Sequence, residues 1–527
     1  MKKWTTVVAS LLLAGSLIAQ NYEDVLRTSE VFPRGNAQFM AMSGAMGVFG
    51  NNMSAVSVNP AAFLTATLAT TKQETSRLGG DISAMNGNGL RRYAVELTPA
   101  FSYIKTKNYF PGYYEGGHVR GFYKHRVSTA LRLPNMGFMV AQNTPNAGVL
   151  SGVSYGFTMN NQNIFDAAIR YETPSSTSSL TDAALVNAEL FGVNYERVES
   201  FQDLFWHSYL LHKDNVGWFT DFTEDSPPTY GQRQTAIITR SGGRNEYVLN
   251  FGMDFSRYVY VGANLSIQNL NYSRQFVLEE RDESNLLPIL NNFMYRENVD
   301  VEGSGLMGKF GVIVRPIEFV RVGFAYHTPT TFFLTEEFSQ SVNAQFDQNA
   351  GGKGQNIMTG SADSFNSYNY TISTPDRVLA SLGCTITNMI TIGVDYESVN
   401  YAKGYINTRN SDFAYTNENT DVMKNLKRAN NVKIGAEFSY NMYSVRVGTA
   451  LYGNPYVNSN NDDGLYRSDI SAGIGMRTES GFYCDLACVK STYKQENILY
   501  TDLHNNAVRG ISRIKNTDCS LTFGFRF

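Results

Sequence analysis

The feature that most constrains this chain is a two-residue alternation of apolar and polar side chains, which recurs from near residue 95 to the C-terminus. In residues 521–527, Leu and Phe alternate with Thr, Gly and Arg, and residues 390–397, 432–439 and 470–477 show the same pattern. Successive side chains of a β-strand point to opposite faces, so each segment has one apolar face and one face of glycine, hydroxyl and charged groups. The alternation predicts an all-β fold.

Connection lengths separate the two architectures that such strands can build. A soluble sandwich turns its apolar faces inward, whereas a transmembrane barrel turns them toward lipid and lines its interior with polar groups. Among fourteen candidate strands, long connections such as 174–242 and 339–367 alternate with short ones such as 387–388 and 441–442. Segregated long loops and short turns are typical of bacterial barrels. We therefore predict a fourteen-stranded antiparallel transmembrane β-barrel over residues 96–527.

Composition agrees with this architecture and excludes others. Charged residues make up 17% of the chain, against about 25% in a typical soluble domain. A mean hydropathy of −0.26 excludes a bundle of transmembrane helices. With 44 basic and 47 acidic residues, the chain has no basic footprint for nucleic acid.

The N-terminus has the features of an export signal. Lys2 and Lys3 precede an apolar stretch over residues 7–18, and Ala19 and Gln20 stand where a cleavage site belongs. No cysteine lies near position 20, which argues against a lipid anchor. We expect residues 1–20 to be a cleaved signal peptide and the mature chain to reside in the bacterial outer membrane.

Two regions fall outside the strand pattern. Residues 21–95 are rich in Met, Gly, Ala and Asn, and they are too many for a simple tail, so we expect them to fold inside the barrel as a plug, or hatch. Within the largest loop, 174–242, residues 201–212 predict an amphipathic helix over the extracellular mouth. Its candidate substrate contacts are Phe201, Leu204, Phe205 and Tyr209.

No motif predicts catalysis, a metal site or a bound cofactor. The four cysteines (Cys384, Cys484, Cys488 and Cys519) form no C-x-x-C pair, and we interpret them as small residues on the apolar faces of strands. The six histidines lack ligand spacing, and the G-x-G-x-x-G match at 303–308 runs into a strand instead of opening a helix. We expect a protein that is not an enzyme.

The alternation of side chains along the strands predicts that a set of charged residues points into the lumen. They either form ion-paired ladders that stiffen the barrel or contact the plug or a polar group of a substrate, and the sequence leaves both roles open. These residues are Asp254, Lys309, Arg321, Asp395, Glu397, Lys433, Glu437, Arg446, Asp485 and Arg526.

The N-terminal region resembles a known family. Residues 34–45 (RGNAQFMAMSGA) precede 54–61 (SAVSVNPA), and this order is similar to the hatch of the FadL/TodX outer-membrane transporters, in which a small-residue segment leads to Asn-Pro-Ala. Here Asn59, Pro60 and Ala61 match that triplet. Weaker matches occur at 326–330, 373–377, 435–438 and 453–456, and the terminal Phe527 resembles the signal that barrel-assembly machinery reads.

The resemblance implies a fourteen-stranded barrel, an N-terminal hatch, and passive uptake of an apolar small molecule. We also expect the protein to be a monomer in contact with outer-membrane lipids. Some relatives are described as haemin receptors, and others act in protein secretion. The alternatives are therefore a non-enzymatic accessory or surface-interaction barrel, such as a secretion component, and an outer-membrane enzyme. The turn Asn59–Pro60–Ala61 is either a gate in the hatch or a fixed structural turn.

Overall fold

The computed structural model describes residues 21–50, 52–63, 91–110, 114–115, 118–119, 122–144, 148–223, 228–283, 285–347, 357–387, 389–408, 415–457 and 465–527. The expected signal peptide, 1–20, and part of the expected hatch, 64–90, lie outside these ranges.

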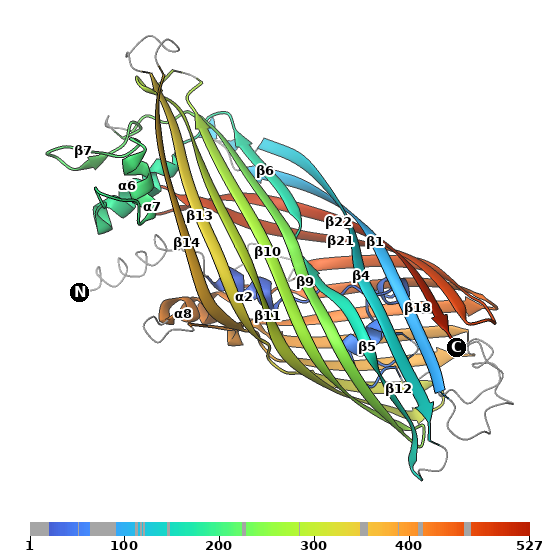
Figure 1. The fold of residues 1–527 in the computed structure, drawn as a ribbon. Helices are drawn as coiled ribbons and strands as arrows, with labels where there is room; N and C mark the ends of the chain where they lie inside the picture. The colour runs from blue at the N-terminus through green and yellow to red at the C-terminus, as the bar shows by residue number, and fades with distance from the viewer. Residues whose placement is uncertain are drawn as a thin grey trace.

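The described residues form a closed antiparallel barrel of fourteen strands (Figure 1), which confirms the predicted fold class. Each strand pairs with its neighbours in sequence, and β1 also pairs with β22, so the sheet closes. Four strands are interrupted, and their two parts are named together here. The strands are β1 (Arg91–Phe110), β4 (Phe122–Asn143), β5 (Leu150–Ile164) with β6 (Ala167–Thr173), β9 (Arg233–Phe255), β10 (Val259–Arg281), β11 (Leu290–Ile317), β12 (Val320–His327) with β13 (Thr331–Asp347), β14 (Ile357–Ser373) with β15 (Arg377–Ile386), β16 (Ile390–Asn400) with β17 (Tyr405–Thr408), β18 (Arg428–Tyr440), β19 (Tyr443–Gly453), β20 (Leu465–Arg477), β21 (Phe482–Thr501) and β22 (Ala507–Arg526).

Several strands extend further than the sequence predicted. β9 begins at Arg233, inside the expected loop 174–242, and β13 and β14 occupy much of the expected loop 339–367. The sequence analysis missed these parts because the apolar side chains change from the outer face to the inner face along a strand, an inversion of the hydrophobic face. On β10, Val261, Leu265 and Ile267 are exposed on the outer face, but beyond them Leu270 and Tyr272 are buried on the inner face.

This inversion divides the barrel into two zones. Near the short turns the outer surface is an apolar belt, the surface that a transmembrane barrel presents to lipid. Toward the long loops, β9 to β14 continue beyond the belt with a polar exterior and an apolar interior. No helix in the described part of the chain is both long and apolar enough to cross a bilayer.

The described part of the expected hatch, residues 21–50 and 52–63, lies against the inner face of the barrel wall (Figure 1). It contains α2 (Tyr22–Ser29), α3 (Ala37–Ala41) and the 3-10 turn η1 (Ser54–Ser57). Asn21 caps α2: its side chain accepts hydrogen bonds from the Glu23 and Asp24 amides, and Asp24 bonds back to the Asn21 amide. Most residues of α3 and η1 are buried against the inner wall.

A cap of loop segments covers the mouth. It includes α6 (Leu180–Phe191), α7 (Phe201–His207) and the hairpin β7–β8 (His212–Lys213 and Trp218–Phe219). The predicted mouth helix 201–212 is correct at its start and wrong at its end. It stops at His207 because Ser208 is its C-cap and Tyr209 has a φ of 60°, which helical geometry forbids. A further helix, α8 (Thr416–Asn425), lies in the connection between β17 and β18.

Two of the cysteines are bonded to each other, which the sequence analysis did not predict. Cys488 and Cys519 are direct cross-strand neighbours on β21 and β22 and form a disulfide. Cys384 and Cys484 are free thiols on partly exposed positions of the wall.

Candidate functional site: hatch seat, wall break and apolar interior

Glycines on successive strands let backbone and side-chain atoms of the hatch lie directly on the wall. A Cβ atom on Gly262 would fall 2.3 Å from the Pro60 carbonyl carbon, and one on Gly311 would fall 2.0 Å from Asn59 Oδ1. On Gly435 it would meet the Met42 carbonyl oxygen at 2.8 Å. Only glycine fits such a close approach. We call this set the glycine seat: Gly262, Gly311, Gly323, Gly383, Gly393, Gly435, Gly448 and Gly473.

The turn Asn59–Pro60–Ala61 lies in the glycine seat and is bonded to two strands. Asn59 Oδ1 accepts a hydrogen bond from the Ala61 amide at 3.1 Å, and its Nδ2 lies 3.5 Å from the Val312 carbonyl oxygen. The Pro60 carbonyl oxygen accepts from Asn250 Nδ2 at 2.9 Å. Pro60 has a fixed φ, so the turn is conformationally restricted before these bonds form. These contacts hold the turn against β9 and β11.

Three of the expected lumen charges bond to the hatch. Lys309 donates from Nζ to the Ser57 carbonyl oxygen at 2.8 Å and also pairs with Glu246. Asp395 accepts from the Gly47 amide at 3.0 Å, and Glu437 accepts from Gln38 Nε2 at 3.1 Å.

The other expected lumen charges bond mainly to the wall. Glu397 pairs with Arg377 and lies 3.7 Å from Lys433, and Arg446 pairs with Glu437 and Asp485. Asp254 accepts from the Arg257 amide, Arg321 donates to Thr385, and Arg526 lies over the Tyr483 ring. Among the described residues, some of these charges therefore contact the hatch and others pair within the wall.

Sequence reasoning missed two arginines that cap the first hatch helix. Arg244 donates to the Thr28 carbonyl oxygen at 2.6 Å, and Arg377 donates to that of Ser29. These are carbonyls at the C-terminus of α2, where a positive charge is favourable. No sequence signal links a strand arginine to a helix end more than 200 residues away.

The barrel wall is interrupted where β5 gives way to β6, at Phe165 and Asp166. β4 pairs with β5 only between Asn135–Asn143 and Gly152–Asn160. Beyond that point β6 pairs with β9 on one side, and no pairing joins it to β4 among the described residues. β6 bends inward, and Tyr171 bonds through its hydroxyl to Ser512 of β22 at 2.6 Å. In Figure 1, β6 and β4 diverge here. We call this interruption the wall break.

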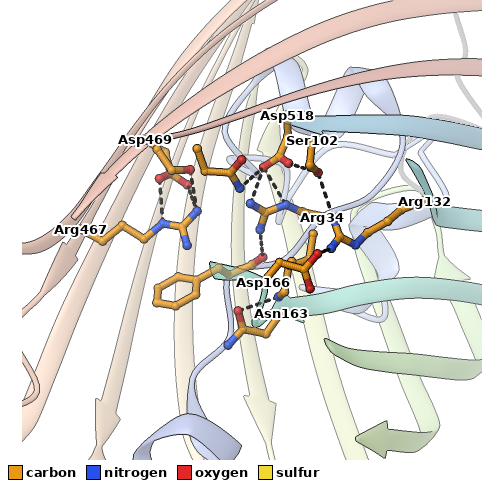
Figure 2. Close-up of polar contacts among 12 residues, drawn as sticks. Arg34, Ser102, Arg132, Asn163, Asp166, Arg467, Asp469 and Asp518 are labelled. Atoms are coloured by element: carbon orange, nitrogen blue, oxygen red, sulfur yellow. Dashed lines mark hydrogen bonds and ion pairs between the residues drawn. The ribbon is translucent and has the colours of Figure 1, made fainter. Parts of the chain in front are cut away.

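Side chains, and not a backbone ladder, close the wall break. Arg132 of β4 forms an ion pair with Asp166 (Figure 2), and Lys124 forms a second one with Glu172 at 3.0 Å. Thr106 of β1 donates to the Ala168 carbonyl oxygen at 2.7 Å. Such contacts between partly exposed side chains are individually weak. This part of the wall can therefore open at lower cost than a paired strand.

Apolar side chains fill the outer zone from the cap to the wall break. Three of the four expected substrate contacts are buried: Phe201 is 8% exposed, and Leu204 and Phe205 are 0% exposed. They pack with inward residues of β9 to β14. The fourth, Tyr209, is 56% exposed and faces solvent. A second buried cluster surrounds Val25 and Leu26 of α2 and includes Phe165 at the wall break. The first cluster reaches the wall break through Ala167 and Ile169 of β6, and the second reaches it through Phe165. We call these two separate clusters the apolar interior.

Charged side chains line part of the space between hatch and wall. A cavity of about 20 Å³ lies there, lined by Arg244, Lys309, Arg377 and Lys433 among others. Within the described residues, no group of three or more His, Cys, Asp or Glu side chains could hold a metal ion.

Several solved structures align with nearly the whole chain. A Pseudomonas aeruginosa FadL homologue is 14% identical, with a TM-score of 0.48 over 94% of this chain and 99% of that one. The P. putida toluene transporter TodX is 10% identical, with a TM-score of 0.45 over 94% and 99%. The CymD monoaromatic hydrocarbon channel is 11% identical, with a TM-score of 0.43 over 94% and 98%. No family model and no curated protein sequence matches. The chain is similar in structure to FadL- and TodX-type proteins.

Proposed function

We propose that this protein is a channel of the bacterial outer membrane for passive uptake of apolar small molecules and is not an enzyme. The observation that supports this most strongly is the apolar interior, which runs from the cap to a wall break closed only by side chains. A soluble core would have no reason to end at an opening in a barrel wall.

The proposed path begins at the cap, near α7, and passes through the apolar cluster around α2. Burial of an apolar molecule along this path contributes roughly 25 cal/mol per Å² of apolar surface. The molecule then leaves sideways at the wall break, into the hydrocarbon region of the membrane. The hatch stays on the glycine seat throughout, and the turn Asn59–Pro60–Ala61 acts in this proposal as a fixed turn.

A second candidate is a non-enzymatic accessory or surface-interaction barrel, and one observation favours it. In the described part of the chain, the hatch packs directly on wall glycines, and the cavity lined by Arg244 and Lys309 between hatch and wall measures only about 20 Å³. An accessory barrel would need no route at all, whereas the channel proposal needs the one through the wall break.

Uptake into proteoliposomes distinguishes the two functions. The purified protein is reconstituted, and entry of an apolar fluorescent probe is compared with leakage of a small hydrophilic dye. The channel proposal expects faster entry of the apolar probe than into protein-free vesicles, with the hydrophilic dye retained. Equal apolar entry with and without protein would contradict it and favour the accessory role.

A further inference from the structure

Six basic side chains gather on the outer surface of three adjacent strands, β21, β22 and β1. They lie directly beyond the apolar belt, on the side of the long loops, and all six are exposed. Tyr103, which ends the belt on β1, lies two residues before the first of them. We call this set the basic cluster: Lys105, Lys107, Lys490, Lys494, Arg513 and Lys515.

The strand register places like charges of the basic cluster directly opposite each other. Lys105 is the cross-strand neighbour of Lys515, and Lys107 is that of Arg513. On the other side of β22, Arg513 is also the neighbour of Lys494. Like charges in these positions repel each other and destabilise a sheet. The register therefore concentrates positive charge in an arrangement that the sheet itself disfavours.

The wall supplies no negative charge that offsets this repulsion. Glu496 is the one carboxylate on the outward faces of β1, β21 and β22, three strands that the structure describes completely, and it pairs with Arg509 at 3.3 Å. In the described part of the chain, Lys105, Arg513 and Lys515 belong to no ion pair. The cross-strand neighbours of the basic cluster on β4 and β20 are not carboxylates either: His125, Val127 and Ile470.

The positive charge is confined to this side of the barrel. Beyond the belt on β11 and β13, the outward residues Asp300 and Glu337 are exposed cross-strand neighbours, and Glu302 is exposed on the same face of β11. On β10, the outward residues in this region are Asn269 and Asn271, which are uncharged. A surface that serves solubility alone mixes charges of both signs. A patch of one sign indicates a partner of the opposite sign.

We propose that the basic cluster binds the phosphate groups of a phosphorylated glycolipid in the outer leaflet of the bacterial outer membrane. Lipid headgroups lie where the hydrocarbon region ends, which is the level of the wall at which the basic cluster begins. Phe101 and Leu131 are exposed cross-strand neighbours in the belt directly below it, and they offer an apolar surface to the acyl chains of the same lipid.

The spacing of the basic cluster suits phosphate. Alternate residues of a strand lie roughly 7 Å apart, and neighbouring strands lie about 5 Å apart. Several flexible ammonium groups and one guanidinium group therefore reach the same phosphate oxygens, and both groups are established phosphate donors. The bound phosphates would remove the repulsion within the register. This proposal takes the long loops to be extracellular, but it does not depend on what the barrel transports.

Binding of diphosphorylated lipid A to the purified full-length barrel, in a neutral detergent, tests the proposal. The variant Lys105→Gln, Lys515→Gln removes two charges that lie opposite each other. One basic residue near an anionic lipid surface strengthens binding about fivefold, so we expect the double variant to bind about 25-fold more weakly than the wild type. Unchanged affinity would overturn the proposal.

Two further variants separate the basic cluster from net charge and from folding. Arg281→Gln, Lys403→Gln is the matched control, because it removes two exposed cations outside the basic cluster, each paired with a carboxylate. We expect affinity within about twofold of the wild type, and an equal 25-fold loss would overturn the proposal. Lys105→Arg, Lys515→Arg keeps both charges and is expected to retain binding, whereas a 25-fold loss would also overturn it.

The unfolding temperature of the lipid-free barrel excludes a purely structural role. Because Lys105→Gln, Lys515→Gln relieves a repulsion, we expect this variant to unfold at the wild-type temperature or above it. A lower unfolding temperature would mean that the two charges stabilise the wall without a ligand, which would overturn the proposal.

Three comparisons identify the source of the phosphate. Dephosphorylated lipid A is expected to bind the wild type at least about tenfold more weakly than the diphosphorylated form, and equal binding would show that acyl chains alone hold the lipid. Inorganic phosphate and polyglutamate, each at the concentration of lipid A, are expected not to displace it. Displacement by inorganic phosphate would indicate a site for free anions, and displacement by polyglutamate would indicate a site for an acidic protein segment. Equal binding or either displacement would overturn the assignment to a membrane lipid.

Discussion

The glycine seat predicts that adding one methyl group to the wall displaces the hatch. In Gly262→Ala the new Cβ would lie 2.3 Å from the Pro60 carbonyl carbon and 2.5 Å from the Ala61 nitrogen. Both atoms belong to the backbone and cannot move aside by changing a rotamer. Overpacking of this kind typically costs about 1–3 kcal/mol, which corresponds to a rise of roughly 5- to 150-fold in the population with an unseated hatch.

Gly308→Ala is the matched control on the neighbouring strand. Its nearest neighbours would be Thr328 Cγ2 at 3.6 Å and Phe310 Cε2 at 3.7 Å, which are ordinary van der Waals distances. Both variants are purified as heat-modifiable barrels, and protease cleavage within residues 41–62 is followed over time. We expect cleavage to accelerate in Gly262→Ala and to match the wild type in Gly308→Ala. Equal protection in Gly262→Ala would refute the close packing of hatch on wall.

The barrel was predictable because its strongest signal is local. Alternation in segments such as 432–439 and 470–477 requires only that a strand has two faces. The strand ends were harder, because on β10 the apolar residues move from the outer face at Ile267 to the inner face at Leu270. A prediction that follows a single apolar face loses a strand where the apolar residues change face, and the outer parts of β9, β13 and β14 were therefore assigned to the loops 174–242 and 339–367.

The contacts at the candidate site depend on register and closure, which one sequence does not determine. Arg34 and Asp518 are 484 residues apart and meet only because β22 closes against β1. The Cys488–Cys519 disulfide likewise requires the register of β21 with β22. In contrast, the turn at Asn59 could be found from local sequence, because Pro restricts both itself and the residue before it.

Three further predictions concern the cap, assembly and topology. Burial raises the pKa of Asp182 in α6 from its ordinary value of 3.8 to about 7. Because the raised pKa favours the protonated carboxyl, the docked cap loses stability as the pH rises from about 4 to 7. Amide protection factors in α6, which are corrected for the intrinsic pH dependence of exchange, should therefore be higher at pH 5 than at pH 8, and Asp182→Asn should remove this difference. Deletion of Phe527, whose ring stacks on Tyr93 at 5.3 Å, should reduce the amount of heat-modifiable barrel in the membrane fraction, and unchanged amounts would argue against its role in assembly. A cysteine introduced at Val216, which is 96% exposed in the cap, should react with a membrane-impermeant maleimide on intact cells. A cysteine introduced at Arg257, in a short turn, should react only after the outer membrane is permeabilised. Equal labelling of the two on intact cells would contradict the orientation.

The central claim is that apolar molecules leave through the wall break while the hatch remains seated. Ser43 of the hatch and Ser471 of β20 have their Oγ atoms 2.7 Å apart, so a Ser43→Cys, Ser471→Cys pair is close enough to be linked by a disulfide. The most direct measurement is apolar probe uptake by this variant before and after reduction. We predict equal uptake in both states. Uptake that is absent in the oxidised protein and restored by reduction would contradict the account, because it would mean that the seated hatch itself must move.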